Sequence, residues 1–239
     1  MPGNIMLPVL DDRLLLIASM VRDGGIPLDV GTDHAYVPIY LIKNGLCKRA
    51  VASDINRGPL RRACENARKF NVYDKIDFCL ADGITNTYPE KHGVTDIIIA
   101  GMGGEMIAQI IDSSDYTRIP GVRLILQPMS TVQELRGYLA EMGYATLNEK
   151  VCCAGNKYYT CISAEYDGVR REVPPVRLEI GYGDQNNSDP AVNGFLQDTA
   201  NKLKNKISGK KKGGLSCKHE ESILREVCEI AAARGYEIK

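Results

Sequence analysis

Apolar residues in the first two thirds of the chain follow two alternating patterns. Apolar positions with helical spacing predict amphipathic helices at residues 10–22, 37–44, 59–70, 105–111 and 132–142. Short apolar runs bounded by turn residues predict strands at 26–30, 50–53, 76–80, 96–100 and 122–127. The run at 96–100 is apolar after its first residue, which is typical of a strand covered on both faces. Strands that alternate with helices in this way indicate an α/β fold with a doubly wound, mostly parallel sheet.

Two more strands are predicted at 145–151 and 158–165, with the turn-like Ala154-Gly155-Asn156 between them. Parallel neighbours require a crossover of a dozen or more residues, so this short turn predicts an antiparallel hairpin at the sheet edge. The sequence therefore predicts a Rossmann-like sheet of seven strands with the last one antiparallel. Plain nucleotide-binding Rossmann domains usually lack such a hairpin.

The composition changes after residue 166. Residues 167–194 are rich in Gly, Pro, Asn and Asp and are predicted to be a connector. Helical spacing returns at 196–207 and 223–234, and the glycine- and lysine-rich stretch 208–214 between them is predicted to be a loop. We therefore expect one domain at 1–166, followed at 167–239 by a connector and a small α-helical hairpin or coiled coil.

Charge and cysteine usage narrow the class of protein. Thirty basic residues balance thirty acidic ones, so the charge of the whole molecule points to neither nucleic acid nor membrane. The chain has no apolar run of about 18 residues and no N-terminal basic segment followed by an apolar one. None of the eight cysteines forms a C-x-x-C pair. We expect a cytoplasmic protein with reduced thiols, no bound metal and no membrane partner.

Candidate chemistry begins where the first strand ends. Asp29 is followed by a turn at Gly31 and then by a helix, which is the usual ligand position in such sheets. A dinucleotide would require G-x-G-x-x-G around its pyrophosphate, whereas this loop has one glycine and a second carboxylate at Asp33. Carboxylates repel pyrophosphate but suit the sulfonium and amino groups of S-adenosylmethionine. An NAD-dependent oxidoreductase is therefore disfavoured.

Two further acids end the next strands. Asp54 lies about 20 residues beyond the glycine turn, where an acid can accept hydrogen bonds from ribose hydroxyls. Asp82, followed by Gly83, ends the third strand, where an acid can accept from an adenine amino group. Each acid taken singly could instead be a helix cap or a turn residue. The recurrence of acids at three strand ends favours a cofactor site.

The ends of the fourth and fifth strands are expected to form the acceptor side. Gly101-Met102-Gly103 closes the fourth strand beside the expected methyl group. Enzymes that methylate exocyclic amino groups usually carry an Asn or Asp, two prolines and an aromatic residue here, and this sequence lacks that motif. Glycines leave room for a large acceptor, although a tight turn is the simpler interpretation. Gln127 and Pro128 close the fifth strand and are expected to form a wall of the pocket.

Four segments together resemble the bacterial tRNA (adenine(22)-N1)-methyltransferase family: residues 29–41, 56–59, 99–104 and 123–129. The resemblance extends in order over about residues 10–165. It implies a class I methyltransferase sheet with a C-terminal coiled coil, and methyl transfer from S-adenosylmethionine to N1 of an adenine in the tRNA D-loop. The sequence departs from the family at Thr32, often Ser, at Asp54, commonly Glu, and at Met129, commonly Asn. The last change removes a polar group near the target pocket.

The motifs and the resemblance together assign the cofactor side of the site. The expected cofactor-binding residues are Asp29, Gly31, Thr32, His34, Asp54, Ile55, Asp82, Gly83, Gly101 and Met102. For His34, a hydrogen-bonded structural role is favoured over a catalytic one.

The expected acceptor-side residues are Asp33, Tyr36 and Asn56. We expect Asp33 to orient the adenine amino group and stabilise the cationic product, with Asp29 as the alternative. Tyr36 would stack on the base, with core packing as its alternative, and Asn56 would bind the base edge. Adenine N1 carries a lone pair, so no strong base is required. Because N1 lies on the pairing edge, the base must be unpaired or extruded first.

The C-terminal segment is the candidate RNA contact. Residues 195–239 contain ten Lys or Arg against six Asp or Glu, which favours tRNA as partner but also suits a solvated helix face. The lysines concerned are Lys202, Lys204, Lys206, Lys210, Lys211 and Lys212. A methyltransferase for another RNA position or a small molecule, and a non-catalytic RNA-binding protein on the same scaffold, remain alternatives. The sequence leaves the oligomeric state open.

Overall fold

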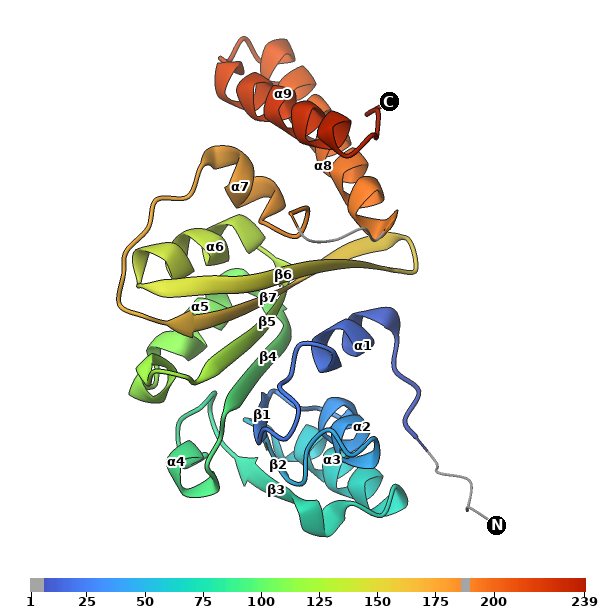
Figure 1. Ribbon diagram of the computed structural model, residues 1–239, viewed down its shortest axis with the longest axis vertical. Coiled ribbons are helices and arrows are strands. Elements are labelled where there is room, and N and C mark those ends of the chain that lie inside the picture. Colours follow the sequence, from blue (N-terminus) through green and yellow to red (C-terminus); the bar gives the residue numbers. More distant parts are fainter. Residues whose placement is uncertain (1–6, 186–189) are drawn as a thin grey trace.

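A computed structural model describes residues 7–185 and 190–239 (Figure 1). Residues 1–6, in the predicted N-terminal domain, and 186–189, in the predicted connector, lie outside the described residues. The strands are β1 (Pro27–Val30), β2 (Ala50–Asp54), β3 (Ile76–Leu80), β4 (Asp96–Gly103), β5 (Arg123–Ser130), β6 (Tyr144–Ala154) and β7 (Lys157–Tyr166). The helices are α1 (Asp12–Ala18), α2 (Tyr36–Lys43), α3 (Arg57–Lys69), α4 (Pro89–His92), α5 (Gly104–Asp112), α6 (Val132–Glu141), α7 (Pro175–Ile180), α8 (Pro190–Lys212) and α9 (Lys218–Ala233).

The sheet has the order β3-β2-β1-β4-β5-β7-β6. Strands β1 to β5 pair in parallel, whereas β7 is antiparallel to both β5 and β6. The predicted seven strands and the antiparallel hairpin are therefore confirmed. The first helix is shorter than predicted, because it begins at Asp12, where the Asp11 side chain accepts a hydrogen bond from the Leu14 amide at 2.8 Å, and ends at Ala18.

Helices cover both faces of the sheet, as Figure 1 shows, with α1, α2 and α3 on one side and α5 and α6 on the other. The position of strand β4, covered by helices on both faces, explains why Ile97, Ile98 and Ile99 are all apolar. Ile98 packs into the core with α1, α2 and α3, whereas its neighbours Ile97 and Ile99 pack into the core with α5 and α6. All three side chains are fully buried, so neither face of this strand tolerates a polar residue.

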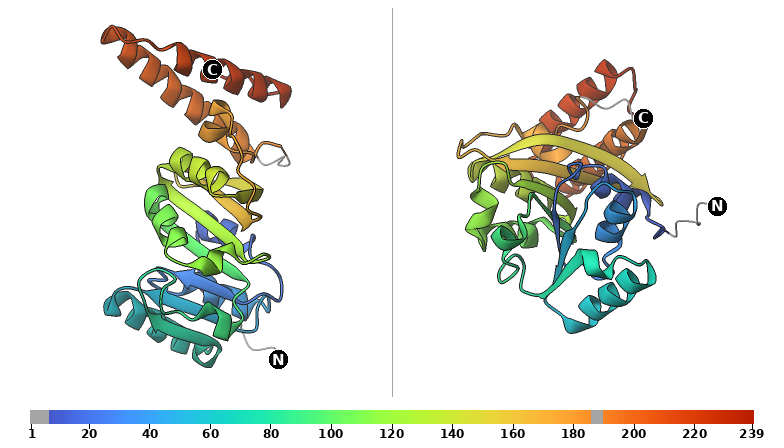
Figure 2. Two further views of the ribbon diagram at one scale, coloured as in Figure 1. Left: turned by 90° about the vertical axis from the view of Figure 1, so that its left-hand side faces the viewer. Right: turned by 60° about the horizontal axis from the view of Figure 1, so that its bottom comes forward.

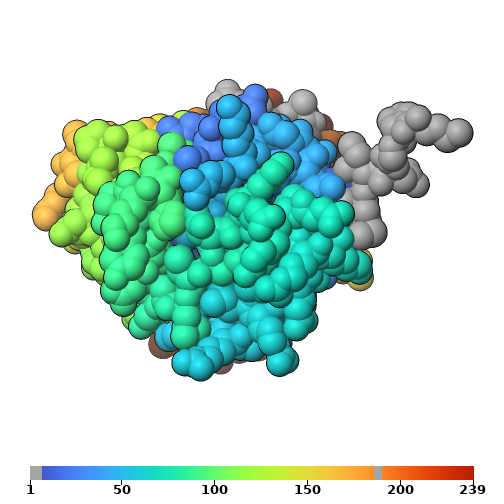
Figure 3. All heavy atoms as spheres, turned by 90° about the horizontal axis from the view of Figure 1, so that it is seen from below, coloured from blue at the N-terminus to red at the C-terminus, as the bar shows by residue number. Residues whose placement is uncertain are grey.

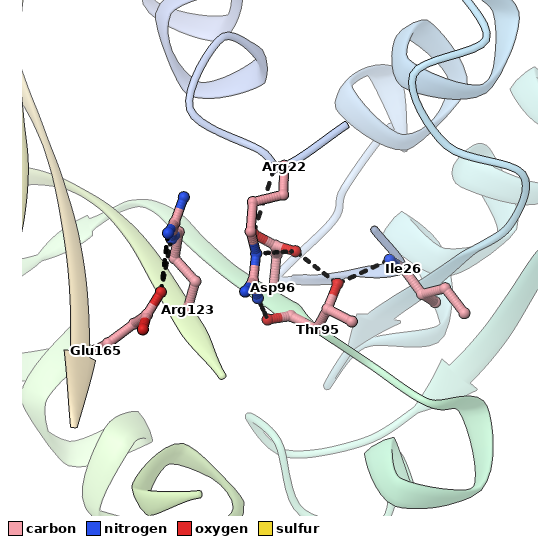
Figure 4. A network of polar contacts seen from close by, with 6 residues as sticks. All are labelled: Arg22, Ile26, Thr95, Asp96, Arg123 and Glu165. Carbon is pink, nitrogen blue, oxygen red and sulfur yellow. Dashed lines mark hydrogen bonds and ion pairs between the residues drawn. The ribbon is translucent and has the colours of Figure 1, made fainter. Parts of the chain in front are cut away.

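A network of polar contacts ties together the amino ends of the central strands (Figure 4). The fully buried carboxylate of Asp96 accepts from Arg22 Nε at 3.1 Å and from the Thr95 hydroxyl at 2.6 Å. Beside it, Arg123 on β5 donates to Glu165 on β7 at 2.9 Å. These contacts occupy the amino ends of the strands, so the opposite, carboxyl edge remains available to a ligand.

The C-terminal segment differs from the prediction in two places. The predicted connector contains α7 and the start of α8, because Val176 and Ile180 bury one face of a short helix that begins at Pro175. The predicted loop at 208–214 is wrong, since α8 continues to Lys212 and breaks only at the following glycines. Ile207 packs within this segment and lysines beyond it pair with acids of α9, which extends the helix through a loop-like sequence.

A buried ion pair attaches the connector to the sheet domain. Arg136 of α6 donates through Nε to Glu149 of β6 at 3.1 Å, and through Nη1 to the carbonyl oxygen of Leu178 at 2.6 Å. The second oxygen of Glu149 accepts from the Tyr182 amide at 3.0 Å. Arg136 and Glu149 are 5% and 4% exposed, so each charge depends on the other for compensation.

Helices α8 and α9 form an antiparallel pair that projects beyond the β6 edge (Figure 2, left). They share an apolar core with α7 and with Val151 of β6. Seen from the opposite end in Figure 3, the blue-to-green part of the chain covers most of the face, with yellow-green and orange segments along the left side. No described helix is both long and apolar enough to cross a membrane.

Candidate active site

The predicted site residues gather at the carboxyl edge of the parallel strands. Asp29 is the third residue of β1, Asp54 is the last of β2, and Gly101 lies in the last part of β4. Strands β2 and β4 flank β1, so the direction of the sheet order reverses at β1. A reversal of this kind leaves a crevice at the carboxyl edge, where open α/β sheets bind their ligands.

The loop after β1 has a backbone that only particular residues tolerate. Gly31 has φ +72°, and a Cβ added there would lie 2.3 Å from Cε of Met102 on β4. Asp33 and Ala35 also have positive φ values, +35° and +55°. Non-glycine residues in this region each cost of order 1 kcal/mol and concentrate at functional sites. The loop therefore keeps its backbone close to the end of β4.

Asp29 is a buried acid with an unusual environment. Its carboxylate is 8% exposed and accepts from the Thr32 hydroxyl at 2.6 Å. Burial raises the pKa of Asp29 to about 6; the Thr32 hydrogen bond opposes this rise and the nearby charge of Asp54 adds to it. Within the described residues, no cationic side chain contacts Asp29. A buried, uncompensated carboxylate at a ligand edge fits a positively charged ligand group.

The second and third strands present one buried and one exposed acid. Asp54 is also 8% exposed and accepts from the Asn56 amide at 2.7 Å, which holds its carboxylate at the start of α3. The side chain of Ile55 is 59% exposed. Asp82 and Gly83 come two and three residues after the end of β3, and Asp82 is exposed. The three predicted strand-end acids thus lie on three adjacent strands of one edge.

A cluster around Asp33 contains a partner that the sequence analysis missed. The Asp33 carboxylate forms an ion pair with Arg62 of α3, whose Nε lies at 3.2 Å, and is 3.4 Å from Nε2 of His34. The His34 ring stacks on the Tyr36 ring with 5.1 Å between centroids. The backbone carbonyl of His34 accepts a hydrogen bond from Asn66 Nδ2 at 3.0 Å. Arg62 is 29 positions from Asp33, and no local pattern relates them.

Helix α1 supplies a second missed residue. Arg13 Nη1 donates to Oε1 of Gln127 at 2.9 Å, and Gln127 is fully buried in the second half of β5. The same Nη1 lies 3.9 Å from the position that a Cβ on Gly101 would take. Gln127 Nε2 donates to the Pro128 carbonyl at 2.8 Å, which fixes the orientation of the amide. Arg13 therefore lies beside the glycine end of β4.

Several of the lysines predicted to bind RNA form ion pairs with acidic residues of the same segment. Lys206 and Lys210 both contact the Glu220 carboxylate, at 3.3 and 2.7 Å. The other contacts are Lys202 with Asp198 at 2.7 Å, Lys211 with Glu221 at 2.8 Å, and Lys204 with the carbonyl oxygen of Lys239 at 2.6 Å. The pairs of Lys202 and Lys211 are exposed on both sides, so they are weak and can exchange for phosphate. Glu220 is only 3% exposed, so its charge depends on Lys206 and Lys210 for compensation. Lys212 is exposed at the end of α8.

Comparison with known proteins shows the family to which the chain belongs. The family model described as a methyltransferase domain matches residues 10–162. The tRNA (adenine(22)-N(1))-methyltransferase of Bacillus subtilis (strain 168) is 33% identical over 168 residues, which are 67% of this chain and 69% of that protein. The chain belongs to this methyltransferase family.

Solved structures extend the similarity to the C-terminal hairpin. A protein of the NADB-Rossmann superfamily from Streptococcus agalactiae matches with a TM-score of 0.79 and 28% identity, over 97% of this chain and 99% of that one. A Streptococcus pneumoniae protein, provisionally described as a tRNA (m1A22) methyltransferase and solved in complex with S-adenosyl-L-methionine, matches with a TM-score of 0.78 and 30% identity. The match covers 93% of this chain and 99% of the Streptococcus pneumoniae chain. The family resemblance stated from the motifs is therefore confirmed.

Proposed function

We propose that this protein transfers the methyl group of S-adenosyl-L-methionine to N1 of adenine 22 in the D-loop of tRNA. The observation that carries the proposal is the buried, uncompensated carboxylate of Asp29, near the carboxyl end of β1 and next to β4, in a chain of this family. The Bacillus subtilis relative carries this activity in its name, and the Streptococcus pneumoniae neighbour is described with this cofactor bound.

Residues of three strands hold the cofactor in this proposal. Asp82 accepts from the adenine amino group, Asp54 accepts from the ribose hydroxyls, and Asp29 faces the positively charged methionyl end. Gly31, Thr32, His34, Ile55, Gly83, Gly101 and Met102 complete the cofactor contacts. When bound, the cofactor supplies an electrophilic methyl group, and the protein supplies position and charge.

The acceptor adenine enters beside the glycine end of β4. Its neutral N1 already carries the attacking lone pair, so the protein orients the ring and removes no proton beforehand. Tyr36 stacks on the base, extending the ring pair that Tyr36 makes with His34, a contact worth about 1–3 kcal/mol. Asp33 accepts from the amino group and stabilises the positive charge of the methylated ring, with Arg62 holding its carboxylate. Asn56 binds the base edge.

The tRNA itself would contact both parts of the chain. Residues 1–166 provide the cofactor site, and the lysines of α8 in the segment 167–239 bind phosphates in exchange for their acidic partners. Because tRNA is modified inside the cell, the proposed location is the cytoplasm.

The decisive experiment combines radiolabelled S-adenosylmethionine with unmodified tRNA. Transfer to an adenine-22 tRNA, and none to a matched transcript with guanine at position 22, is expected. Mass spectrometry of the digested product should identify 1-methyladenosine. Methyl transfer to both transcripts would indicate another target position, and cofactor binding with no transfer to any tRNA would contradict the proposed reaction.

A further inference from the structure

Arg13 lies in a place that its local sequence does not explain. Helix α1 packs beside the sheet next to β5, β6 and β7 (Figure 1), with Ile17 and Ala18 buried in the sheet core. This packing directs Arg13 toward the carboxyl ends of β4 and β5, where its side chain is 21% exposed. A partly buried guanidinium at a ligand edge requires an explanation, because burying a positive charge is costly unless an anion compensates it.

The compensation present in the chain is small. Nη1 donates to the neutral amide oxygen of Gln127, and Nε lies 4.0 Å from the carboxylate of Asp11, which is itself 53% exposed. Within the described residues, Nη2 has no hydrogen-bond partner. The guanidinium is therefore fixed in orientation by Gln127 while part of its donor capacity stays available to a ligand.

The order of acids along the edge indicates which ligand group comes here. This step rests on the proposed function. If Asp82 on the β3 side receives the adenine and Asp54 on β2 the ribose, the methionyl part lies over β1 and β4, which come next in the sheet. Asp29 on β1 then faces the cationic groups, and the α-carboxylate lies farther along, toward β4 and β5. Arg13 is the cation placed beside Gly101 of β4.

We propose that Arg13 binds the α-carboxylate of the S-adenosylmethionine methionyl group and so positions the cofactor for transfer. The planar guanidinium matches a carboxylate geometrically, and its orientation is set in advance by the buried amide of Gln127. In this proposal, Asp29 binds the cationic groups of the methionyl end of the cofactor, and Arg13 binds its α-carboxylate.

The test compares ligands that differ in the carboxylate. Isothermal titration calorimetry measures binding of S-adenosylhomocysteine and of decarboxylated S-adenosylhomocysteine to the full-length protein and to Arg13→Ala. For S-adenosylhomocysteine the affinity should fall by about 10- to 100-fold, the usual loss for a charge-assisted hydrogen bond. For the decarboxylated ligand the affinity should change less than twofold. Arg13→Lys should recover part of the loss.

Matched controls separate this inference from the proposed function. Arg61→Ala, on the exposed face of α3, removes an equal charge and should leave both affinities unchanged. Unchanged thermal melting of Arg13→Ala excludes unfolding as the cause of any loss. Equal losses for both ligands, or no loss for either, would overturn the inference. If Arg13→Ala instead bound both ligands normally and lost tRNA affinity with a salt slope reduced by about one, the arginine would be a phosphate contact. Wild-type protein that bound neither ligand would instead refute the cofactor assignment.

Discussion

If Asp29 binds the cationic end of the cofactor as proposed, we expect cofactor binding to depend on pH in a range where few carboxylates titrate. Burial raises its pKa to about 6 in the unliganded protein, from 3.8. A folded pKa above the unfolded value means that the protonated acid is the stabilised form. Stability is therefore greatest below pH 3.8 as far as this group is concerned, and it falls as the pH rises through 6. The difference between the two pKa values corresponds to about 3 kcal/mol of folding stability, which the unliganded protein has lost at neutral pH.

A cationic ligand reverses this cost, because it pairs with the ionised carboxylate. If only the ionised form binds S-adenosylmethionine, the dissociation constant should be about tenfold larger at pH 5 than at pH 8, and about twofold larger at pH 6. Binding at pH 6 should release about half a proton from Asp29. Part of the binding free energy would thus come from pairing the buried carboxylate of Asp29 with the positive charge of S-adenosylmethionine.

Calorimetry at pH 5, 6, 7 and 8, in buffers with different enthalpies of ionisation, measures both quantities. Asp29→Asn serves as the comparison, since it keeps the shape but cannot ionise. The variant should bind more weakly at pH 8 and show no inflection near pH 6. An affinity that stayed constant from pH 5 to 8 in the wild-type protein would refute the assignment of Asp29 to the cationic end of the cofactor.

Three further substitutions test the architecture around the site. Arg136→Ala should destabilise the protein by about 3–5 kcal/mol in urea unfolding, because Glu149 stays buried and charged, whereas apolar replacement of both should cost less. Gly31→Ala should lower the melting temperature, since its Cβ would meet Met102 at a φ of +72°, and Met102→Ala in the same chain should recover part of the loss. Gly181→Ala should lower the melting temperature, because its Cβ would lie 2.0 Å from the Glu149 carboxylate at a φ of +65°.

Local sequence patterns predicted most of the sheet domain, because they record local physical requirements. A strand buried on both faces must be apolar throughout, as Ile97 to Ile99 are, and a tight turn at positive φ requires a residue such as Gly31. The three strand-end acids were found for the same reason: each lies at or within two residues of the end of its own strand. In the C-terminal segment the patterns misled, since the loop-like residues 208–212 are helical where α8 packs against α9.

By itself, the sequence predicted the seven strands, the main helices between them and the family. Only the tertiary structure brought Arg13 to Gln127, 114 positions away, and Arg62 to Asp33. It also buried Arg136 with Glu149 beneath the connector. Side-chain pairs of this kind depend on how helices pack on the sheet, and packing leaves no periodic mark in the chain. The charges that would complete the proposed site were therefore recognised only from the tertiary structure.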